Sequence, residues 1–388
     1  MDLLNTKAIL NKQRTVWIDY DKGISIILVS YGHSYAVLSG HGVIFQDYPL
    51  INYLGVFLYG FRMPLFFIIS GLLIANSLER KGLKGYLTNR LSNILYPLLV
   101  WGIIESTMKV LSAVDTFSLR EIGTTYLNLL IDPRKTGVFW YLNALFFIGT
   151  LYAVVRSALK VGIYVQLLLG IVMFTIGTYL RTNGISLGFV SDILGYYVFF
   201  AIGDYSSKLL LSEKGRKQFT SAKFYIPMLV LFLLTQYYCS KIILSPESSG
   251  IAYLERKMPF IFLLQALIGC TVSISFSFIL QKYRWLPSLR IIGYHSLFIY
   301  CMQIIVMNFT RIFLTGIAEI NNVPLLFFLT WILGIGIPIF IYSIAMKLGM
   351  WWLFTFNKPQ LKEMVKKQPQ ETSKTIMEIQ NDIPQEQV

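Results

Sequence analysis

Long apolar stretches alternate with short polar segments along most of the chain. A transmembrane helix needs about 20 mostly apolar residues, and ten windows meet that requirement. They lie near residues 17–38, 54–77, 95–114, 138–155, 161–180, 190–210, 224–243, 259–280, 293–314 and 323–347. The stretch from Gly42 to Ser77 is long enough to include a re-entrant piece before the second span. The pattern therefore predicts an all-α, polytopic membrane bundle of about ten transmembrane helices.

The composition places part of the protein surface in lipid rather than in water. Of the 388 residues, 55% are hydrophobic, 15% are aromatic and only 14% are charged. Soluble globular domains carry about 25% charged residues and about 45–50% apolar ones. Because a chain this poor in charge cannot cover a water-facing surface, many of its apolar side chains must face hydrocarbon.

The basic residues form short clusters between the apolar stretches and set the predicted topology. The formal net charge is +14, from 34 Lys and Arg against 20 Asp and Glu. Most of the cations fall in alternate connections, as expected for segments that face the cytoplasm. Both termini are therefore predicted to be cytoplasmic. Because no single basic stripe is interleaved with exposed aromatic residues, the charge does not indicate nucleic acid as a partner.

Three regions follow from the same pattern. Residues 1–16 are expected to form a cytoplasmic N-terminal segment, residues 17–350 the transmembrane domain, and residues 351–388 a cytoplasmic tail. The tail is polar and rich in Gln, Lys and Glu from Pro359 onward. It cannot bury enough apolar surface to fold alone and is expected to be disordered. Any chemistry must therefore take place within the membrane domain or at its faces.

The three cysteines do not indicate a metal centre. Cys239, Cys270 and Cys301 lie in or beside apolar stretches, without CxxC spacing or neighbouring histidines. Isolated thiols of this kind are typical of small residues that pack in a core. We therefore expect neither a disulfide framework nor a metal ion.

The first span, WIDYDKGISIILVSYGH, carries an ionisable ring deep in the membrane. His33 follows Lys22 by eleven residues, which is about 16 Å along a helix and close to three full turns. Lys22 and His33 therefore share one helix face, together with Asp19. A simpler interpretation is a histidine satisfied by a nearby hydroxyl, Ser30 or Ser34. The shared face favours function, since the pKa of histidine suits proton abstraction from a hydroxyl.

The second span combines a helix-breaking proline with small residues. Pro64 frees a backbone carbonyl, and Gly71 lets another helix or a ligand approach closely. Ser70 supplies a hydroxyl within an aromatic stretch, although a Ser-Gly pair in a membrane helix is also typical of simple packing. A basic segment follows the span: Arg80, Lys81, Lys84 and Arg90. Such cations bind lipid headgroups, or equally the phosphates of a nucleotide donor such as coenzyme A.

These motifs, in this order, resemble the acyltransferase-3 family. The family signature is Arg or Lys, ten residues, then His, and Lys22 and His33 satisfy that spacing. FRMPLFFIISG is similar to the family's second-span motif, most like its sugar O-acetylase branch, and Arg90 followed by Pro97 is similar to the start of its third span. Three later blocks also resemble family segments: VFWYLNALFF (138–147), YYVFFAIGDY (196–205) and GYHSLFIYCMQ (293–303).

The chain departs from the family pattern at three positions. Arg62 stands where the family often has His. In the paired-arginine RxxR motif only Arg90 is kept, because the second position is Asn93. Near the ninth span, Gln303 replaces a His common in relatives. These departures concern the donor contacts more than membership of the family.

The resemblance implies a membrane-bound O-acyltransferase that uses a cytoplasmic acyl-CoA, commonly acetyl-CoA, as its donor. Arg14 and Arg90 would contact the phosphates of the donor, and Ser70 would hydrogen-bond the acyl group. Residues 17–350 would then form a transmembrane acyltransferase domain in the bacterial inner membrane.

The resemblance also implies an acceptor hydroxyl on a cell-surface or lipid-linked glycan, so the expected product is an O-acetylated polysaccharide of the cell envelope. His33 would serve as general base or as transient acyl carrier. Lys22 and Asp19 would orient His33 or hold the donor. The expected partners are the glycan or glycolipid acceptor, membrane lipids and the machinery of polysaccharide biosynthesis.

Two other classes of protein remain as alternatives. A transporter or flippase for a polysaccharide precursor needs a polar path across several spans, but charges within the spans are few. Glu105 and Lys109 form one candidate pair, and others lie nearer the ends of their spans. A membrane scaffold without catalysis would leave the shared face of Lys22 and His33 unexplained.

Overall fold

The computed structural model describes residues 9–10, 16–112, 118–248 and 250–357, and within these ranges it contains helices and no strand. The helices are, in chain order, α2 (Val16–Ser39), η1 (Phe45–Asp47), α3 (Pro49–Phe57), α4 (Tyr59–Leu72), α5 (Ile74–Arg90), η2 (Leu91–Leu95), α6 (Tyr96–Leu111), α7 (Leu119–Ile131), α8 (Pro133–Thr136), α9 (Trp140–Ser157), α10 (Ile163–Thr182), α11 (Phe189–Leu210), α12 (Glu213–Phe219), α13 (Ala222–Ile243), α14 (Tyr253–Lys257), α15 (Pro259–Tyr283), α16 (Pro287–Tyr294), α17 (Ser296–Gly316), α18 (Val323–Lys347) and η4 (Trp351–Leu353). The prediction of an all-α bundle is confirmed.

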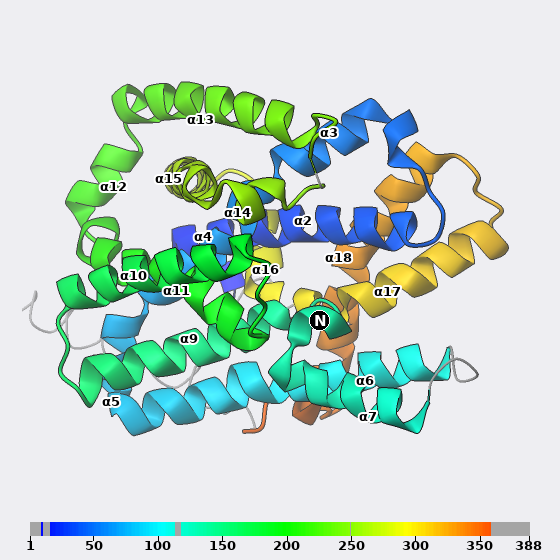
Figure 1. Cartoon of the computed structure of the whole chain (residues 1–388), viewed down its shortest axis with the longest axis horizontal. Coiled ribbons are helices and arrows are strands. Elements are labelled where there is room, and N and C mark those ends of the chain that lie inside the picture. The colour runs from blue at the N-terminus through cyan, green and yellow to red at the C-terminus, as the bar shows by residue number, and fades with distance from the viewer. Residues whose placement is uncertain (1–8, 11–15, 113–117, 249, 358–388) are drawn as a thin grey trace, which may run out of the picture.

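Helix α2, which carries His33, runs through the middle of the bundle (Figure 1). It is a single uninterrupted helix, as the first apolar window predicted, and it packs against α4, α15, α16, α17 and α18. Trp17 stacks on Phe278 of α15 with ring centroids 4.6 Å apart. Gly293 of α16 lets the two backbones touch, because a Cβ there would lie only 2.8 Å from the carbonyl carbon of Asp19. Helix α2 is therefore held on several sides, which fixes the position of His33.

The second predicted span, 54–77, is divided among three helices. A short helix α3 precedes α4, in the stretch where a re-entrant piece was expected, and α4 ends at Leu72. The basic segment that follows belongs to helix α5, which is kinked at Gly82, where φ is 63°. Only glycine adopts such a conformation without strain. Sequence periodicity missed this helix because its exposed face is polar.

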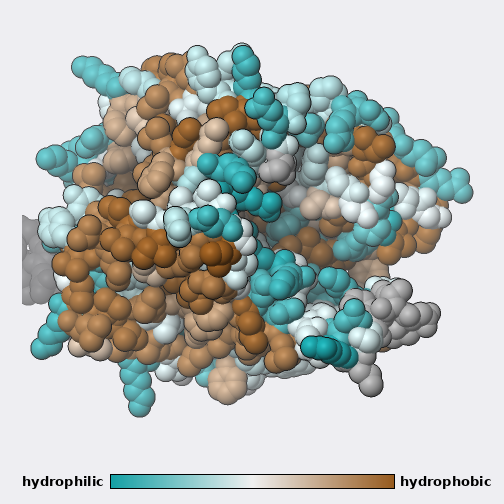
Figure 2. Space-filling model, viewed as in Figure 1, coloured by the Kyte–Doolittle hydropathy of each residue, from teal (hydrophilic) through white to brown (hydrophobic). Residues whose placement is uncertain are grey.

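The outer surface agrees with a membrane environment. Figure 2 shows a broad hydrophobic area over the part of the molecule where α10 lies, while hydrophilic residues gather around a hollow at the centre of the view. Only 22% of the most apolar window of α10 and 28% of that of α13 is buried. Apolar faces left open to this extent are stable in lipid and not in water.

Seven helical stretches in the described ranges are long and apolar enough to cross a membrane. The chain is therefore a multi-pass membrane protein. Helices α2, α9 and α11 are not among the seven; α2 and α11 carry buried acidic side chains, Asp21 and Asp192 among them. The count of ten spans and the cytoplasmic location of both termini stay predictions.

The beginning of the predicted tail packs on the bundle. The indole of Trp101 in α6 donates a hydrogen bond to the carbonyl oxygen of Leu353 at 2.9 Å, and Phe354 is buried. The side chain of Ser92 contacts that of Thr355 at 3.0 Å. Residues 358–388, which include the part expected to be disordered, lie outside the described residues.

Candidate functional site

His33 stands where two cavities meet, and exposed residues such as Ser39 and Gln46 show that one of them opens at the surface. One cavity, of about 110 Å³, is lined by His33 and by residues of α4, α9, α11, α14, α15 and α17. The other, of about 630 Å³, is lined by the second half of α2, by α3 and by the end of α13. His33 and Arg62 are common to both linings. A group bound in either cavity would therefore lie beside the imidazole.

The simpler interpretation of His33, a ring satisfied by a neighbouring hydroxyl, does not match the contacts. Ser30 donates its hydroxyl hydrogen to the amide oxygen of Gln303 at 2.7 Å. Ser34 donates to the carbonyl oxygen of Phe327 at 3.3 Å. Both hydroxyls are therefore engaged elsewhere, and the imidazole faces the cavities.

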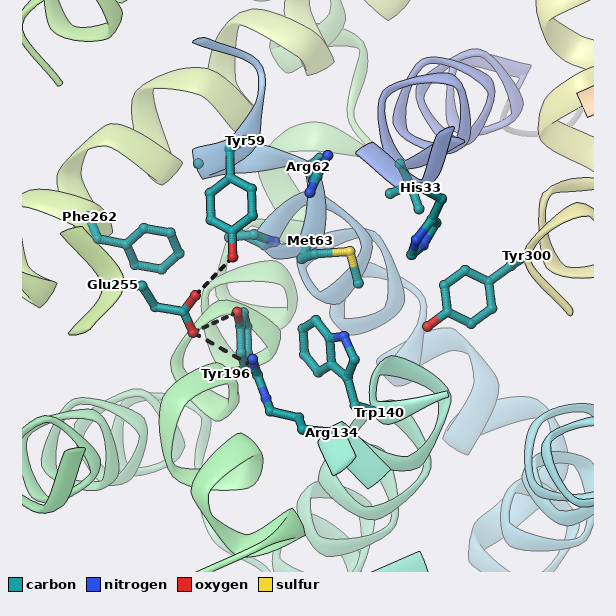
Figure 3. Close-up of a pocket in the computed structure, with 13 residues that line it drawn as sticks. His33, Tyr59, Arg62, Met63, Arg134, Trp140, Tyr196, Glu255, Phe262 and Tyr300 are labelled. Atoms are coloured by element: carbon teal, nitrogen blue, oxygen red, sulfur yellow. Dashed lines mark hydrogen bonds and ion pairs between the residues drawn. The ribbon is translucent and has the colours of Figure 1, made fainter. Parts of the chain in front are cut away.

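Aromatic side chains form the wall of the smaller cavity opposite α2. Figure 3 shows the His33 ring directed toward Tyr300, with Met63 and Trp140 beside them. The centroids of the His33 and Tyr300 rings are 6.4 Å apart, and the Tyr300 hydroxyl donates to the carbonyl oxygen of Val138. These contacts fix the Tyr300 ring against the end of the cavity that holds His33.

Ser70, expected near the acyl group, lies one layer behind this wall. Its side chain interacts with the side chain of Tyr141. Tyr141 in turn packs edge-on against Tyr300, with centroids 5.4 Å apart. Ser70 thus reaches the cavity through two tyrosine rings and does not line it.

An ion-pair network closes the other end of the smaller cavity. Glu255 accepts hydrogen bonds from Arg181 at 3.1 Å and from the hydroxyl of Tyr196 at 3.1 Å, and the guanidinium of Arg134 lies 3.7 Å away. Arg134 also donates to Asp192 at 2.6 Å and lies 4.0 Å from the centroid of the Trp140 ring.

This network keeps Glu255 ionised. Burial alone would raise the pKa of the Glu255 carboxyl, but the guanidinium groups of Arg134 and Arg181 hold it below its ordinary value. Because its oxygens are already occupied, Glu255 is suited to holding α8, α10, α11 and α14 together at this end of the cavity rather than to binding substrate.

Lys22 and Asp19 do not line either cavity around His33. Both are half-buried on α2, and Lys22 is about 16 Å from His33 along the helix. The fully buried acid of this segment is Asp21, which sequence reasoning did not select. It accepts hydrogen bonds from Ser273 at 2.6 Å and Ser277 at 3.0 Å. Asp21 therefore fastens α2 to α15.

Of the two arginines expected at the phosphates, Arg90 points into the protein. Its guanidinium donates to the hydroxyl of Tyr86 at 2.8 Å and to the carbonyl oxygen of Leu145, and the residue is buried. Arg14 lies outside the described residues. The donor contacts assigned to both stay predictions.

Sequence reasoning missed several residues around the imidazole. Trp140 and Tyr300 lie within two of the blocks that resemble the family, so the signal for them was present. Arg134 and Glu255 lie between the apolar windows, and their pairing across 121 positions of sequence has no local signature. Among the described residues, no group of three or more His, Cys, Asp or Glu side chains is placed to hold a metal ion.

Fold and site together define a multi-pass membrane protein with an imidazole between two cavities. The chain belongs to the acyltransferase-3 family: the family model, described as an acyltransferase domain, matches residues 15–359. The match covers nearly the whole chain, so the family predicted from the motifs is confirmed.

Three curated relatives share shorter segments with the chain. Nodulation protein NolL of Mesorhizobium japonicum is 31% identical over 152 residues, 39% of each chain. NolL of Sinorhizobium fredii is 32% identical over 131 residues, 34% of each chain. Inner membrane protein YcfT of Escherichia coli is 36% identical over 94 residues, 22% of this chain and 26% of YcfT. The similarity thus spans less than half of each relative's length. No solved structure matches the chain.

Proposed function

We propose that this acyltransferase moves an acetyl group from acetyl-CoA at the cytoplasmic side to a hydroxyl of a cell-surface or lipid-linked glycan. The observation that supports the proposal is the imidazole of His33 between two cavities. Family membership supplies the reaction class. The similarity to inner membrane protein YcfT supports a location in the bacterial inner membrane.

The donor would approach from the side where α5 and α18 end. Exposed Arg80, Lys81 and Lys84 of α5 offer cations for the phosphates of coenzyme A. A cavity of about 310 Å³ nearby is lined by polar side chains, Asn93 among them, and by Phe298 of α17. Tyr300, on the same helix, lines the smaller cavity at His33. We propose that the pantetheine arm passes from the first of these cavities to the second to reach the imidazole.

In the proposed reaction His33 acts as general base. The acceptor oxygen forms a bond to the thioester carbon while its proton passes to the imidazole. When the tetrahedral intermediate collapses, the carbon–sulfur bond breaks and the imidazolium returns the proton to the thiolate sulfur. The products are the glycan ester and free coenzyme A. Positioned proton transfer of this kind typically contributes about 10²–10⁴-fold to the rate.

Mass spectrometry of the cell-envelope glycans tests the proposal. The wild-type protein, His33→Ala and His41→Ala are compared in cells that lack the native gene. His41 is an exposed histidine near the end of α2, so its replacement controls for loss of a histidine as such. We expect the acetyl increment to vanish with His33→Ala alone, at equal membrane insertion. An unchanged glycan profile with His33→Ala would overturn the proposal.

A further inference from the structure

Arg62 differs from Arg134, the other arginine that lines the smaller cavity, because it has no acid partner. Arg134 forms an ion pair with the buried carboxylate of Asp192. Within the described ranges, no carboxylate oxygen lies within 4.0 Å of the Arg62 guanidinium. A cation inside a membrane bundle is costly unless an anion or a polar cavity accompanies it. Arg62 is therefore suited to receive negative charge from a ligand.

The fold holds the guanidinium of Arg62 directly beside the helix that carries His33. One nitrogen, Nη1, donates to the carbonyl oxygen of Leu28 at 3.2 Å. Gly32 makes room for the group, because a Cβ there would lie 2.8 Å from its central carbon. The guanidinium also packs against the ring of Tyr59, 4.7 Å from the ring centroid. Figure 3 shows Arg62 between Tyr59 and His33.

The sizes of the two cavities assign them to different halves of a reaction. A cavity of about 150 Å³ holds a benzene molecule, so the cavity of about 110 Å³ fits an acyl group of a few atoms. The cavity of about 630 Å³ falls in the range of about 300–1,000 Å³ typical of ligand pockets and fits a sugar. Since Arg62 and His33 line both, the reacting bond would form beside these two side chains.

We infer that Arg62 is a catalytic residue that binds the carbonyl oxygen of the acyl group and stabilises the oxyanion. This inference rests on the proposed acyl transfer. As the acceptor oxygen bonds to the carbonyl carbon, an electron pair moves onto the carbonyl oxygen beside the guanidinium, and the proton moves to His33. When the carbon–sulfur bond breaks, the pair returns to re-form the carbonyl, and the sulfur takes the proton.

The charges of the site favour this role over a structural one. The reaction creates an imidazolium at His33 and an oxyanion at the same time. A guanidinium beside an imidazole opposes protonation of that ring unless a negative charge appears next to the guanidinium. Oxyanion formation at Arg62 would thus allow His33 to take the proton. Groups that already point to the place where charge develops usually make the largest single contribution to the rate enhancement.

The test measures thiol release from acetyl-CoA by purified protein in lipid nanodiscs. Lipid-linked glycans extracted from the host's own membranes serve as acceptor. The variants are Arg62→Ala, Arg62→Lys, His33→Gln and, as control, Arg120→Ala on the exposed face of α7. Loss of one oxyanion donor lowers kcat by about 10²–10³-fold. We expect that loss for Arg62→Ala with little change in KM, a smaller loss for Arg62→Lys, and none for Arg120→Ala.

Chemical rescue separates catalysis from structure. Added guanidinium ions at millimolar concentration are expected to restore part of the activity of Arg62→Ala, which a collapsed fold would not allow. Wild-type kcat in Arg62→Lys and Arg62→Ala, or a higher acceptor KM at unchanged kcat, would overturn the oxyanion role. If His33→Gln also kept wild-type activity, the proposed function itself would fail. If His33→Gln alone were inactive, only the role of Arg62 would be lost.

Discussion

The crossing of α4 and α11 depends on Gly71, and its replacement by alanine is expected to disturb the site from a distance. A Cβ at Gly71 would lie 2.9 Å from the carbonyl carbon of Phe200 and 3.2 Å from the nitrogen of Asp204. The carbonyl oxygen of Phe200 would be closer still, and non-bonded carbons keep about 3.5–4.0 Å apart, so the two helices must separate by at least about 0.6–1 Å. Overpacking of this kind costs about 1–3 kcal/mol.

The same displacement reaches the reacting groups, because α4 carries Arg62 and α11 carries Tyr196 at the cavity. A misplacement of about 1 Å lowers activity by about 10²-fold. We therefore expect Gly71→Ala to lower both the unfolding temperature and the turnover of acetyl-CoA. The matched control is Gly123→Ala on α7, where a Cβ meets no atom within 4 Å. Gly123→Ala should stabilise the helix by up to about 1 kcal/mol.

Thermal unfolding in detergent and thiol release in nanodiscs give the two readouts. If Gly71→Ala and Gly123→Ala had equal unfolding temperatures and equal turnover, the close contact of α4 and α11 at Gly71 would not be what positions the site.

Three further predictions concern the network and the donor. Glu255→Gln leaves Arg134 and Arg181 without their shared acid, so we expect a loss of about 3 kcal/mol in denaturant unfolding. Because the folded pKa of Glu255 lies below its ordinary value of 4.5, its stabilisation is complete above that pH and is lost as the pH falls further. Acid unfolding should therefore be steeper for wild type than for Glu255→Gln. Arg90→Ala should raise KM for acetyl-CoA; an unchanged KM with lowered stability would assign Arg90 to packing alone.

Long apolar windows predicted the helices that face lipid, because hydrocarbon requires about 20 apolar residues whatever the neighbours are. The last window, 323–347, matches α18. Short helices were missed, since amphipathic segments such as α7 (Leu119–Ile131) and α16 (Pro287–Tyr294) carry too few apolar residues for a span. The capping box of Ser118 and Glu121 at the start of α7 was a local signal for one of them.

Residues of the candidate site could be predicted from the sequence only where their spacing along one helix indicates them. Spacing along one helix selected His33, which lines both cavities, but also Lys22 and Asp19, which line neither. The direction of Arg90 into the protein, and the position of Arg62 against Gly32, depend on contacts between helices distant in sequence. No periodicity encodes such contacts, so the structure was needed to find them.

The most direct test of the account measures single-turnover acyl transfer by purified protein in nanodiscs, with radiolabelled acetyl-CoA and host glycolipid as acceptor. His33→Gln is compared with wild type and with His41→Gln. We predict that label appears on the glycolipid with wild type and His41→Gln, and that His33→Gln is slower by about 10²–10⁴-fold. Transfer by His33→Gln at the wild-type rate would contradict a catalytic role for the imidazole between the two cavities.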